Sequence, residues 1–524
     1  MTAAGTAFDP LALMVMSNAV AMIAEEMGAV LERGALSPNI RERRDASAAL
    51  FDARGRMVAQ AAHIPVHLGA MPESVSAVIR LAPEPGDVWL LNDPYAGGSH
   101  LPDLTMVEAI GEGDRIVGFA AIRAHHADVG GMSPGSMPQG ATELFQEGLI
   151  VPPVRIERRG VPADDVMRLV LANVRTPAER RGDLAAQRAA CAAGRAGWLA
   201  LRAREGAQLD HACDALLAYT ARRARARVAE LGVIHGVARD ALEGDGVSDA
   251  DVPVVVTVST LGGKLRLDFT GTSPAVRGNV NCPRSVTRAA SVFVLRTLLD
   301  DDVPTNDGIA DALDLVIPPG SAIDARWPSA VAAGNVEMSQ RLTDTIFAAL
   351  GDAGVPVPAQ GQGTMNNITF GGAGWTFYET LGGGQGGGPR GPGPDAVHVG
   401  MSNTRNTPIE ALERTYPIRI DEYAVRRGSG GQGLHRGGDG IVRRYRVLEQ
   451  CTVTLLTERR RHAPAGAAGG ANGASGLNLL NGQLVPAKCR LELQPGDVVT
   501  VMTPGGGAWG VAPRPGAPSL PRRQ

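Results

Sequence analysis

Half of the histidines in this chain of 524 residues fall within one short, turn-rich region. Ten histidines are present, and five of them lie within 64 residues: His63, His67, His100, His125 and His126. An even spread would place about one histidine in a segment of that length. Aspartates, glycines and prolines surround them in residues 92–103 and 123–131. Imidazoles and carboxylates on turns are ligands for a divalent metal ion, so the fold is expected to bring these groups together.

A β-hairpin is predicted between the two halves of this histidine-rich region. Residues 104–110 and 115–122 form two apolar, strand-like runs. Residues 111–114 hold glycines and charged residues and are predicted to form a four-residue turn. Adjacent strands joined by a short turn must pair antiparallel, so this prediction needs no long-range assumption.

The hairpin also predicts which residues face each other beyond its regular part. If the residues that flank the four-residue turn are paired, His100 lies opposite His125 and Asp103 lies opposite Ile122. Pro102 has no N–H donor and must end the regular ladder. The HxxD segment, His100 to Asp103, is therefore expected beside the histidine pair.

Two imidazoles and one carboxylate form a metal-ligand set that leaves coordination positions open. The candidate ligands are Asp45, His100, Asp103 and His125, with Asp45 contributed by an earlier loop. Such a set suits Zn²⁺, Mn²⁺ or Fe²⁺, and water on such a metal is a nucleophile near neutral pH. His126 and Asp128 are candidate catalytic residues that orient a ligand or transfer a proton. The alternative is that the histidines are hydrogen-bonded core residues and that Asp103 caps a turn.

The chain as a whole predicts an α+β protein with several lobes, because its length exceeds one ordinary core. Gly and Pro are abundant, which favours many turns that carry function. The predicted parts are an N-terminal metal-site lobe (1–160), a helical segment (161–245), an α/β middle lobe (246–381) and a β-rich C-terminal lobe (395–511). Residues 382–394 form a Gly/Pro-rich linker or a loop close to a ligand or partner, and residues 512–524 form a disordered tail.

Periodicity predicts individual elements. Apolar residues at three- and four-residue steps from Leu13 to Val30 predict an amphipathic helix. The segment from Pro162 to Leu231 is predicted to be helical, with breaks at Gly182, Gly194 and Gly206. Other helices are expected near 286–300 and 336–351. Strands are expected near 87–91, 254–258 (with Pro253 just ahead of it), 265–269 after a turn at Gly262-Gly263, 416–426, 441–457 and 486–502.

Composition and missing motifs exclude several classes of protein. The net charge of −3 offers no electrostatic footprint for nucleic acid. Five scattered cysteines without a CxxC pair indicate a reducing compartment, so a cytoplasmic location is expected. No basic segment precedes an apolar one at the N-terminus, and Leu11 to Ile23 is too short and polar to span a membrane. No GxxxxGK[ST] motif announces a site for ATP, and the glycines at 382–388 do not fit a dinucleotide fingerprint.

Short motifs spread in order along nearly the whole chain are recognisable. They occupy residues 92–103, 125–131, 134–137, 145–149, 182–187, 268–273, 303–308, 378–384, 403–410, 436–440 and 503–507. Together they resemble the hydantoinase B/oxoprolinase family. Ala508 stands where the last glycine motif usually continues with Gly, and residues 385–388 are looser than the usual pattern.

The resemblance implies one half of a two-component, ATP-dependent enzyme. In that family an A-type subunit with an actin-like nucleotide fold phosphorylates the carbonyl of a small cyclic amide, and the B-type chain completes hydrolysis of the C–N bond. The positions that match the metal ligands of related chains are His100, Asp103 and His125, with Asp45 assigned to a fourth, acidic place. A hetero-oligomer with an A-type partner is therefore expected. The alternatives are a subunit of an acetone- or acetophenone-type ketone carboxylase and a non-catalytic scaffold.

Overall fold

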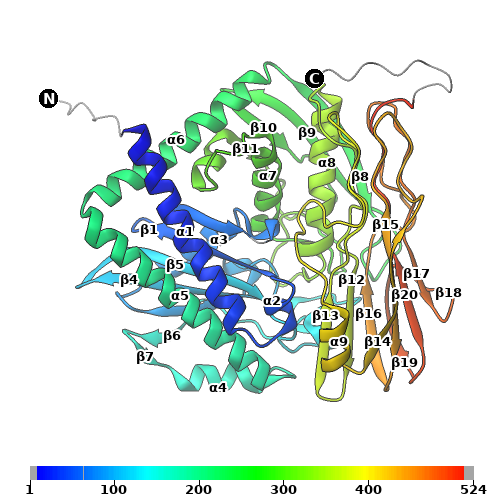
Figure 1. Ribbon diagram of the computed structural model, residues 1–524, viewed down its shortest axis with the longest axis horizontal. Helices are drawn as coiled ribbons and strands as arrows, with labels where there is room; N and C mark the ends of the chain where they lie inside the picture. Colours follow the sequence, from blue (N-terminus) through cyan, green and yellow to red (C-terminus); the bar gives the residue numbers. More distant parts are fainter. Residues whose placement is uncertain (1–8, 63, 513–524) are drawn as a thin grey trace.

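A seven-stranded antiparallel sheet forms the centre of the N-terminal half (Figure 1). The protein is described here by a computed structural model of residues 9–62 and 64–512, so His63 lies outside the described residues. The strand order is β2-β1-β5-β4-β3-β6-β7. The strands are β1 Ala46–Asp52, β2 Met57–Ala62, β3 Val88–Leu91, β4 Asp103–Glu112, β5 Arg115–His125, β6 Val154–Arg158 and β7 Val161–Pro162.

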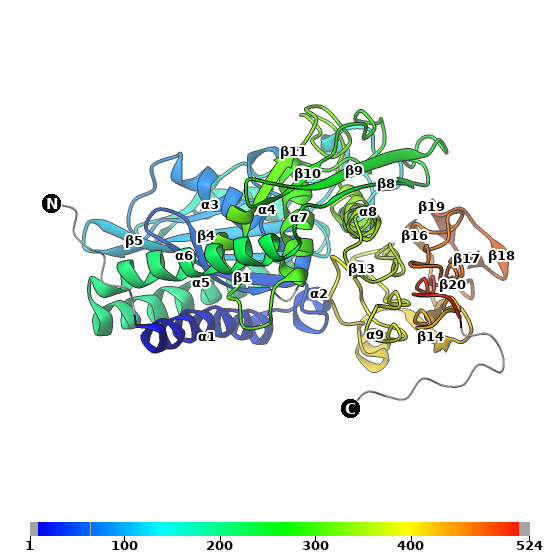
Figure 2. The ribbon, with the colours of Figure 1, turned by 90° about the horizontal axis from the view of Figure 1, so that it is seen from above.

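Helices cover both faces of this sheet, as Figure 2 shows from above. On one face, α1 (Pro10–Gly34) and α5 (Pro177–Glu205) pack on each other and share a core with Leu50 and Met106 of the strands. On the opposite face, α3 (Met71–Ile79) packs on residues such as Val107. Alternation along each strand gives the sheet two apolar faces, and both are buried. The other helices of this half are α2 Pro38–Arg41, α4 Asp164–Ala172 and α6 Gln208–Glu230.

The middle of the chain forms a second sheet with its own helices. The order β11-β10-β9-β8 joins four strands, and helices α7 and α8 share the core of this sheet. The bounds are β8 His235–Leu242, β9 Val252–Leu261, β10 Lys264–Asp268, α7 Arg284–Leu298, β11 Leu313–Val316 and α8 Ser339–Asp352, with a π-helical turn at Gly334–Met338 directly before α8.

Two further sheets share one core in the C-terminal part. Their orders are β13-β12-β16-β19 and β14-β15-β20-β17-β18. Apolar residues of both sheets, such as Phe370 and Tyr445, contribute to this core. The bounds are β12 Asn367–Gly372, β13 Trp375–Glu379, α9 Ile409–Thr415, β14 Ile418–Arg426, β15 Gly440–Val447, β16 Cys451–Leu456, β17 Leu477–Leu480, β18 Gln483–Leu484, β19 Lys488–Leu493 and β20 Val498–Met502.

The mixed α+β class predicted from the sequence is confirmed by these helices and sheets. The amphipathic helix appears as α1, whose Leu13, Val20 and Met27 are buried. Among the described residues, α1 alone is long and apolar enough to cross a membrane. The core helices of globular proteins can have the same length and composition, and one face of α1 packs on α5.

The predicted hairpin forms, but its turn is shorter than the four residues at 111–114. Glu112 pairs with Arg115, and only Gly113 and Asp114 lie in the turn. Gly113 has a φ of +60°, a left-handed conformation that glycine adopts without strain. A two-residue turn with glycine in this conformation matches the twist of paired strands, so the ladder extends two residues further than predicted.

The predicted register is shifted by three residues, two from the shorter turn and one from a β-bulge between Ile110 and Gly111. Asp103, rather than His100, lies opposite His125, and the expected pairing of Asp103 with Ile122 is wrong. β4 begins directly after Pro102, which confirms that this proline ends the ladder. His100 therefore approaches His125 from the loop before β4.

Two of the three predicted helix breaks are also wrong. Gly182 and Gly194 lie inside α5, and only Gly206, with a φ of +59°, ends it. A Cβ at Gly194 would lie 2.5 Å from Sδ of Met27, and one at Gly182 would lie 2.3 Å from a methyl group of Leu36. These glycines therefore allow close helix packing instead of breaking the helix.

The predicted position of Pro253 is also wrong, because this residue lies inside β9 rather than ahead of it. It is opposite Ala241 of the edge strand β8. The position is the second in the strand and the side chain is exposed. Proline is tolerated near the end of a strand, where few ladder hydrogen bonds are lost.

The Gly/Pro-rich residues 382–394 pack against two other glycine-rich segments. The Gly384 N–H donates to Pro504 O at 3.0 Å, the Gly387 N–H to Gly507 O at 2.8 Å, and the Gly438 N–H to Gln385 O at 2.8 Å. A Cβ at Gly384 would lie 1.9 Å from Gly438 O. The segment is therefore a packed loop that needs glycine for close backbone contact, and not an extended linker.

Candidate metal centre

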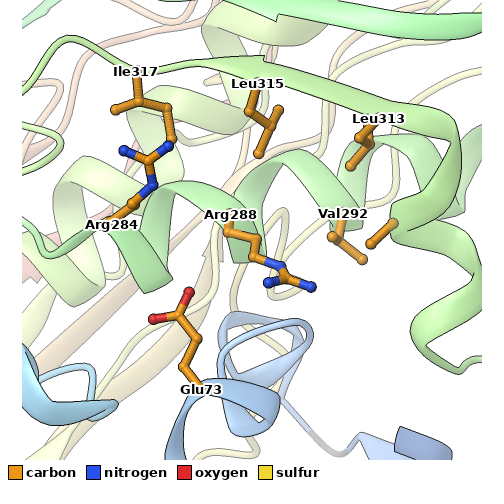
Figure 3. Close-up of a pocket in the computed structure, with 8 residues that line it drawn as sticks. Glu73, Arg284, Arg288, Val292, Leu313, Leu315 and Ile317 are labelled. Atoms are coloured by element: carbon orange, nitrogen blue, oxygen red, sulfur yellow. The ribbon is translucent and has the colours of Figure 1, made fainter. Parts of the chain in front are cut away.

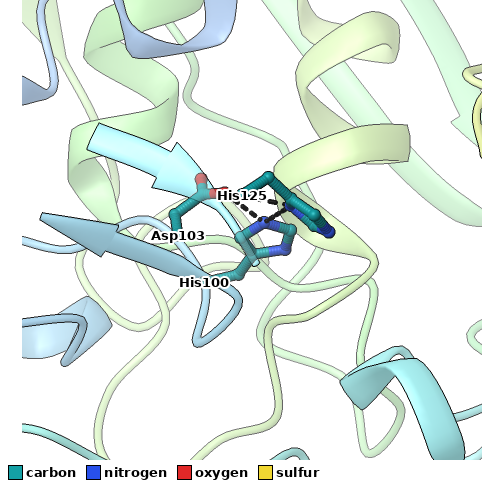
Figure 4. Close-up of side chains that lie close together, drawn as sticks. All are labelled: His100, Asp103 and His125. Atoms are coloured by element: carbon teal, nitrogen blue, oxygen red, sulfur yellow. Dashed lines mark hydrogen bonds and ion pairs between the residues drawn. The ribbon is translucent and has the colours of Figure 1, made fainter. Parts of the chain in front are cut away.

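Three buried side chains converge at the end of the β4–β5 hairpin (Figure 4). Asp103 Oδ1 lies 2.9 Å from His100 Nε2 and 3.1 Å from His125 Nδ1. The two imidazole nitrogens are 3.2 Å apart. One ligand atom from each of these three residues, called the triad below, lies within 4.8 Å of the others.

Local structure explains how the triad forms. Asp103 and His125 are a cross-strand pair at the first position of β4 and the last of β5. The loop before β4 is held by Asn92, whose Nδ2 donates to Leu101 O at 2.7 Å. His100 lies in this loop, and its Nδ1 lies 3.1 Å from Ala332 O. Residues from distant parts of the chain therefore hold the ring that the hairpin does not place.

The second oxygen of Asp103 is surrounded by further polar groups. Ser99 Oγ donates to Asp103 Oδ2 at 2.6 Å, and Asn335 Nδ2 donates to it at 3.3 Å. His67 Nε2 lies 3.4 Å from the same oxygen, and His67 Nδ1 lies 3.1 Å from Ser47 Oγ. These contacts leave Oδ1 directed at His100 and His125 and orient the carboxylate toward them.

Opposite charges determine how the triad ionises. Burial would raise the pKa of Asp103, but His100 and hydrogen bonds from His125 and His67 hold that pKa well below its usual range. Burial would lower the pKa of His100, yet the Asp103 carboxylate outweighs it, so that pKa is raised. Burial lowers the pKa of His125. The centre is therefore a buried carboxylate that attracts positive charge.

The donor set fits a divalent metal ion. The carbonyl of Ala332 can only accept, so His100 Nδ1 carries a proton and the other ring nitrogen, Nε2, is directed at Asp103. When Nε2 is unprotonated, its lone pair faces the carboxylate. A lone pair and a carboxylate oxygen at this distance require a cation between them, either a proton or a metal. Two nitrogens and one oxygen match Zn²⁺, Mn²⁺ or Fe²⁺. His125 Nε2 is buried without a hydrogen-bond partner in the described structure.

Asp45, the fourth candidate ligand, lies near the triad but outside the group of converging donors. Its backbone carbonyl accepts a hydrogen bond from the His125 N–H at 3.0 Å. Its carboxylate lies 3.8 Å from the guanidinium of Arg43 and is buried. The negative charge of Asp45 acts to raise the pKa of both triad histidines, which indicates its proximity.

The structure does not bring His126 to the triad. Its Nε2 lies 2.9 Å from Gln187 Oε1, on the side of the sheet covered by α5. Burial and the nearby charge of Arg180 lower the pKa of His126 to about 4, so the ring is neutral near neutral pH. The side chain therefore belongs to the contact between the hairpin and α5.

Asp128, the other catalytic candidate, is occupied by hydrogen bonds within its loop. Its two oxygens accept from the N–H groups of Gly130 and Gly135, each at 3.0 Å, and from the N–H of Arg175 at 2.9 Å. The Arg175 guanidinium also donates to it, at 2.9 Å. This carboxylate orders the segment after His126 and has no contact with the triad.

Besides Ser99 and Ala332, three residues that the sequence analysis did not assign contact the triad. They are His67, Asn335 and Tyr378, whose ring stacks on His125 with centroids 4.5 Å apart. His67 belongs to the histidine cluster and Tyr378 to a recognised motif, so two of the three carried a signal. No local sequence pattern predicts that His67 or Tyr378 lies near the hairpin, because both residues belong to other elements.

Glu147 is a buried acid close to the triad and gives a prediction about pH. Burial raises its pKa to about 8, although the N–H groups of Ala332 and Val331 and the charge of His100 act to lower it. Between the ordinary glutamate pKa of 4.5 and about 8, the folded chain holds a proton that the unfolded chain has released. The free energy of unfolding therefore falls with rising pH, by at most about 1.4 kcal/mol per pH unit from this group.

Glu147→Gln is expected to make the free energy of unfolding fall less steeply with rising pH, because the amide cannot titrate. The amide oxygen can still accept from the N–H groups of Val331 and Ala332. Thermal unfolding between about pH 6 and about pH 8 measures the effect. The exposed Glu449→Gln is the matched control and should keep the native slope. Equal slopes for Glu147→Gln and the native chain would contradict the raised pKa.

Comparison with known proteins gives the centre a context. The family model for hydantoinase B/oxoprolinase matches residues 9–512. An uncharacterized protein of Methanocaldococcus jannaschii, MJ0963, is 39% identical over 514 residues, which cover 96% of this chain and 91% of that protein. A 5-oxoprolinase of Dictyostelium discoideum is 38% identical over 530 residues, which cover 96% of this chain but 40% of that protein. The chain thus spans less than half of that relative.

Two solved structures share the fold. The ATP-dependent caprolactamase from Pseudomonas jessenii superposes with a TM-score of 0.89 at 26% identity, over 97% of this chain and 92% of that chain. The nucleotide-free acetone carboxylase gives a TM-score of 0.83 at 17% identity, over 95% of this chain and 75% of that chain. The second likeness shows the fold alone.

Proposed function

The chain belongs to the hydantoinase B/oxoprolinase family, and on that premise we propose that it is the B-type subunit of an ATP-dependent cyclic-amide hydrolase. The observation that carries the proposal is the convergence of His100, Asp103 and His125 in a buried centre. A caprolactamase with the same fold and a related 5-oxoprolinase, both named for cyclic amides, support this class of substrate. An A-type partner would use ATP to phosphorylate the amide oxygen.

In this proposal four residues hold a divalent ion: Asp45, His100, Asp103 and His125. Such an ion supplies Lewis acidity and makes water nucleophilic near neutral pH. Ser99 and Asn335 keep the Asp103 carboxylate oriented toward the histidines. Burial keeps bulk water away from a reactive, phosphorylated substrate. Overall, the ring amide and ATP are both hydrolysed, and an amino acid, ADP and phosphate are formed.

His126 and Asp128 have a different role in this proposal from the proton transfer considered at first. Their hydrogen bonds to Gln187 and Arg175 support the segment that follows His125. They are positioning residues, because neither touches the triad. Proton transfer would then fall to groups that do contact it, such as His67.

The experiment that tests the proposal uses the chain co-purified with an A-type partner. ADP release is measured with 5-oxoproline, hydantoin or caprolactam, and with acetone plus bicarbonate. We expect ADP formation coupled to ring opening with at least one amide, and its loss in His100→Ala. Bicarbonate-dependent turnover of acetone without ring opening would replace the proposal with a ketone carboxylase, and full activity of His100→Ala would indicate a scaffold.

A further inference from the structure

A cavity that contains none of the triad residues opens between α3, α7 and β11 (Figure 3). Its volume is about 230 Å³. It is lined by Glu73, Arg284, Arg288, Val292, Ala310, Leu313, Leu315 and Ile317. This volume is below that of drug-sized sites, about 300–1,000 Å³, and suits a ligand of amino-acid size.

Two of the three charged groups that line this cavity, Glu73 and Arg288, make no direct ion pair in the described part of the chain. Arg288 is half-buried, and in the described part of the chain it makes no hydrogen bond or ion pair. The Glu73 carboxylate, also half-buried, forms no ion pair with either arginine within the described residues. Arg284 has one partner, Asp324, at 3.4 Å. Half-buried charges without partners are costly, and a ligand of matching charge would relieve that cost.

The remaining wall of the cavity is apolar. Val292 of α7, Leu313 and Leu315 of β11, and Ile317 directly after β11 face the same space as the charges. Glu73 projects toward this space from α3, and Arg288 projects toward it from α7 (Figure 3). The cavity therefore offers a cationic group, an anionic group and a hydrocarbon surface within one small volume.

We infer that this cavity binds a zwitterionic amino acid with an apolar chain. Its carboxylate would pair with Arg288, assisted by Arg284, and its ammonium group would pair with Glu73. Its methylene or methyl groups would lie on Val292 and Leu315. A simple organic anion would leave Glu73 unpaired and be repelled by it, and a simple amine would leave Arg288 unpaired.

The inference rests on the proposed function for the identity of the ligand, because opening of a cyclic amide produces an amino acid of this kind. One hydrogen bond links the wall of the cavity to the loop that carries His100. Ser285, next to Arg284, donates a hydrogen bond from Oγ to Gly98 O at 2.8 Å. Gly98 lies two residues before His100, in the loop that carries that ligand candidate.

Binding of 6-aminohexanoate to the full-length chain, measured by titration calorimetry without ATP or partner, tests the inference. We expect one saturable site per chain. Hexanoate and hexylamine, which each lack one charge, should bind at least about 10-fold more weakly, since each leaves one half-buried charge unpaired. Binding should persist in His100→Ala, because the cavity and the triad share no residue.

Variants of the lining locate the site. Arg288→Leu and Glu73→Gln should each weaken binding of 6-aminohexanoate at least about 10-fold. Glu73→Gln is isosteric and remains informative if Arg288→Leu fails to fold. Arg419→Leu, an exposed arginine on β14, is the matched control and should bind as the native chain does.

Three results would overturn the inference: no saturable binding to the native chain, binding to both lining variants as tight as to the native chain, or binding of hexanoate as tight as that of 6-aminohexanoate. The test is independent of turnover. A chain that opens the ring with its partner but fails to bind 6-aminohexanoate refutes only this inference. A chain that binds it as described but supports no ring opening refutes only the proposed function.

Discussion

Asp103→Asn is expected to remove metal binding and ring opening together. Asp103 Oδ1 is the atom that both triad histidines approach, and the side chain carries the negative charge that attracts a cation into a buried site. Asparagine keeps the volume and removes the charge. Loss of outer-shell partners of metal sites already costs about 10–100-fold in affinity or activity, so loss of a ligand should cost at least about 100-fold.

Two measurements check this prediction. Elemental analysis should fall from about one divalent metal per native chain to a small fraction of that in Asp103→Asn, because the site loses its charged oxygen ligand. Amide-dependent ADP release with the partner should fall in parallel. Asp164→Asn, an exposed acid at the start of α4, is the matched control and should keep both properties. Full metal content in Asp103→Asn would contradict the assigned centre.

Arg341→Met is expected to give the largest loss of stability. Arg341 of α8 is fully buried and pairs with Asp240 of β8 at 3.1 Å and with Glu458, after β16, at 3.3 Å. Burial would lower the pKa of this guanidinium, but the two carboxylates outweigh it and raise that pKa. The residue therefore joins the four-stranded sheet that contains β8 to the C-terminal sheets through buried charges.

Removing only the arginine leaves both carboxylates buried with one cation fewer. Breaking a buried ion pair from one side costs about 3–5 kcal/mol, and methionine retains much of the volume. Chemical unfolding of the metal-loaded native chain and of the variant measures the difference. Arg168→Met is the matched control, since Arg168 pairs with Asp165 on the surface. Its free energy of unfolding should change by less than about 0.5 kcal/mol. A similarly small change in Arg341→Met would contradict the prediction.

The β4–β5 hairpin shows which features of the candidate site could be predicted from the sequence. The alternation of apolar residues and the intervening turn predicted both strands, and the centre forms at the end predicted. The predicted register was wrong for two reasons. Turn length depends on whether Gly113 adopts a left-handed conformation, and a β-bulge between Ile110 and Gly111 adds one more residue of shift. His100 and His125 are nevertheless close together, as predicted, because the loop before β4 folds back onto the end of the strand.

The glycines of α5 illustrate the opposite limit. Gly182 and Gly194 were predicted to interrupt the helix, because glycine weakens an isolated helix by about 1 kcal/mol. In the folded chain they lie where α5 meets Leu36 and Met27, and a side chain would clash. A glycine can therefore either end a helix or allow close packing inside one. Tertiary contacts decide between these two roles, and no local sequence pattern distinguishes them.

The sequence by itself determined the α+β class, the amphipathic helix that contains Leu13 to Val30, the hairpin, and the grouping of imidazoles and carboxylates near the end of that hairpin. These features depend on contacts between residues close in the chain, whose periodicity and turn chemistry are visible locally. Only the tertiary structure decided the surroundings of Asp103. His67, Asn335 and Tyr378 reach the centre across long separations, and such contacts depend on how whole sheets and helices pack.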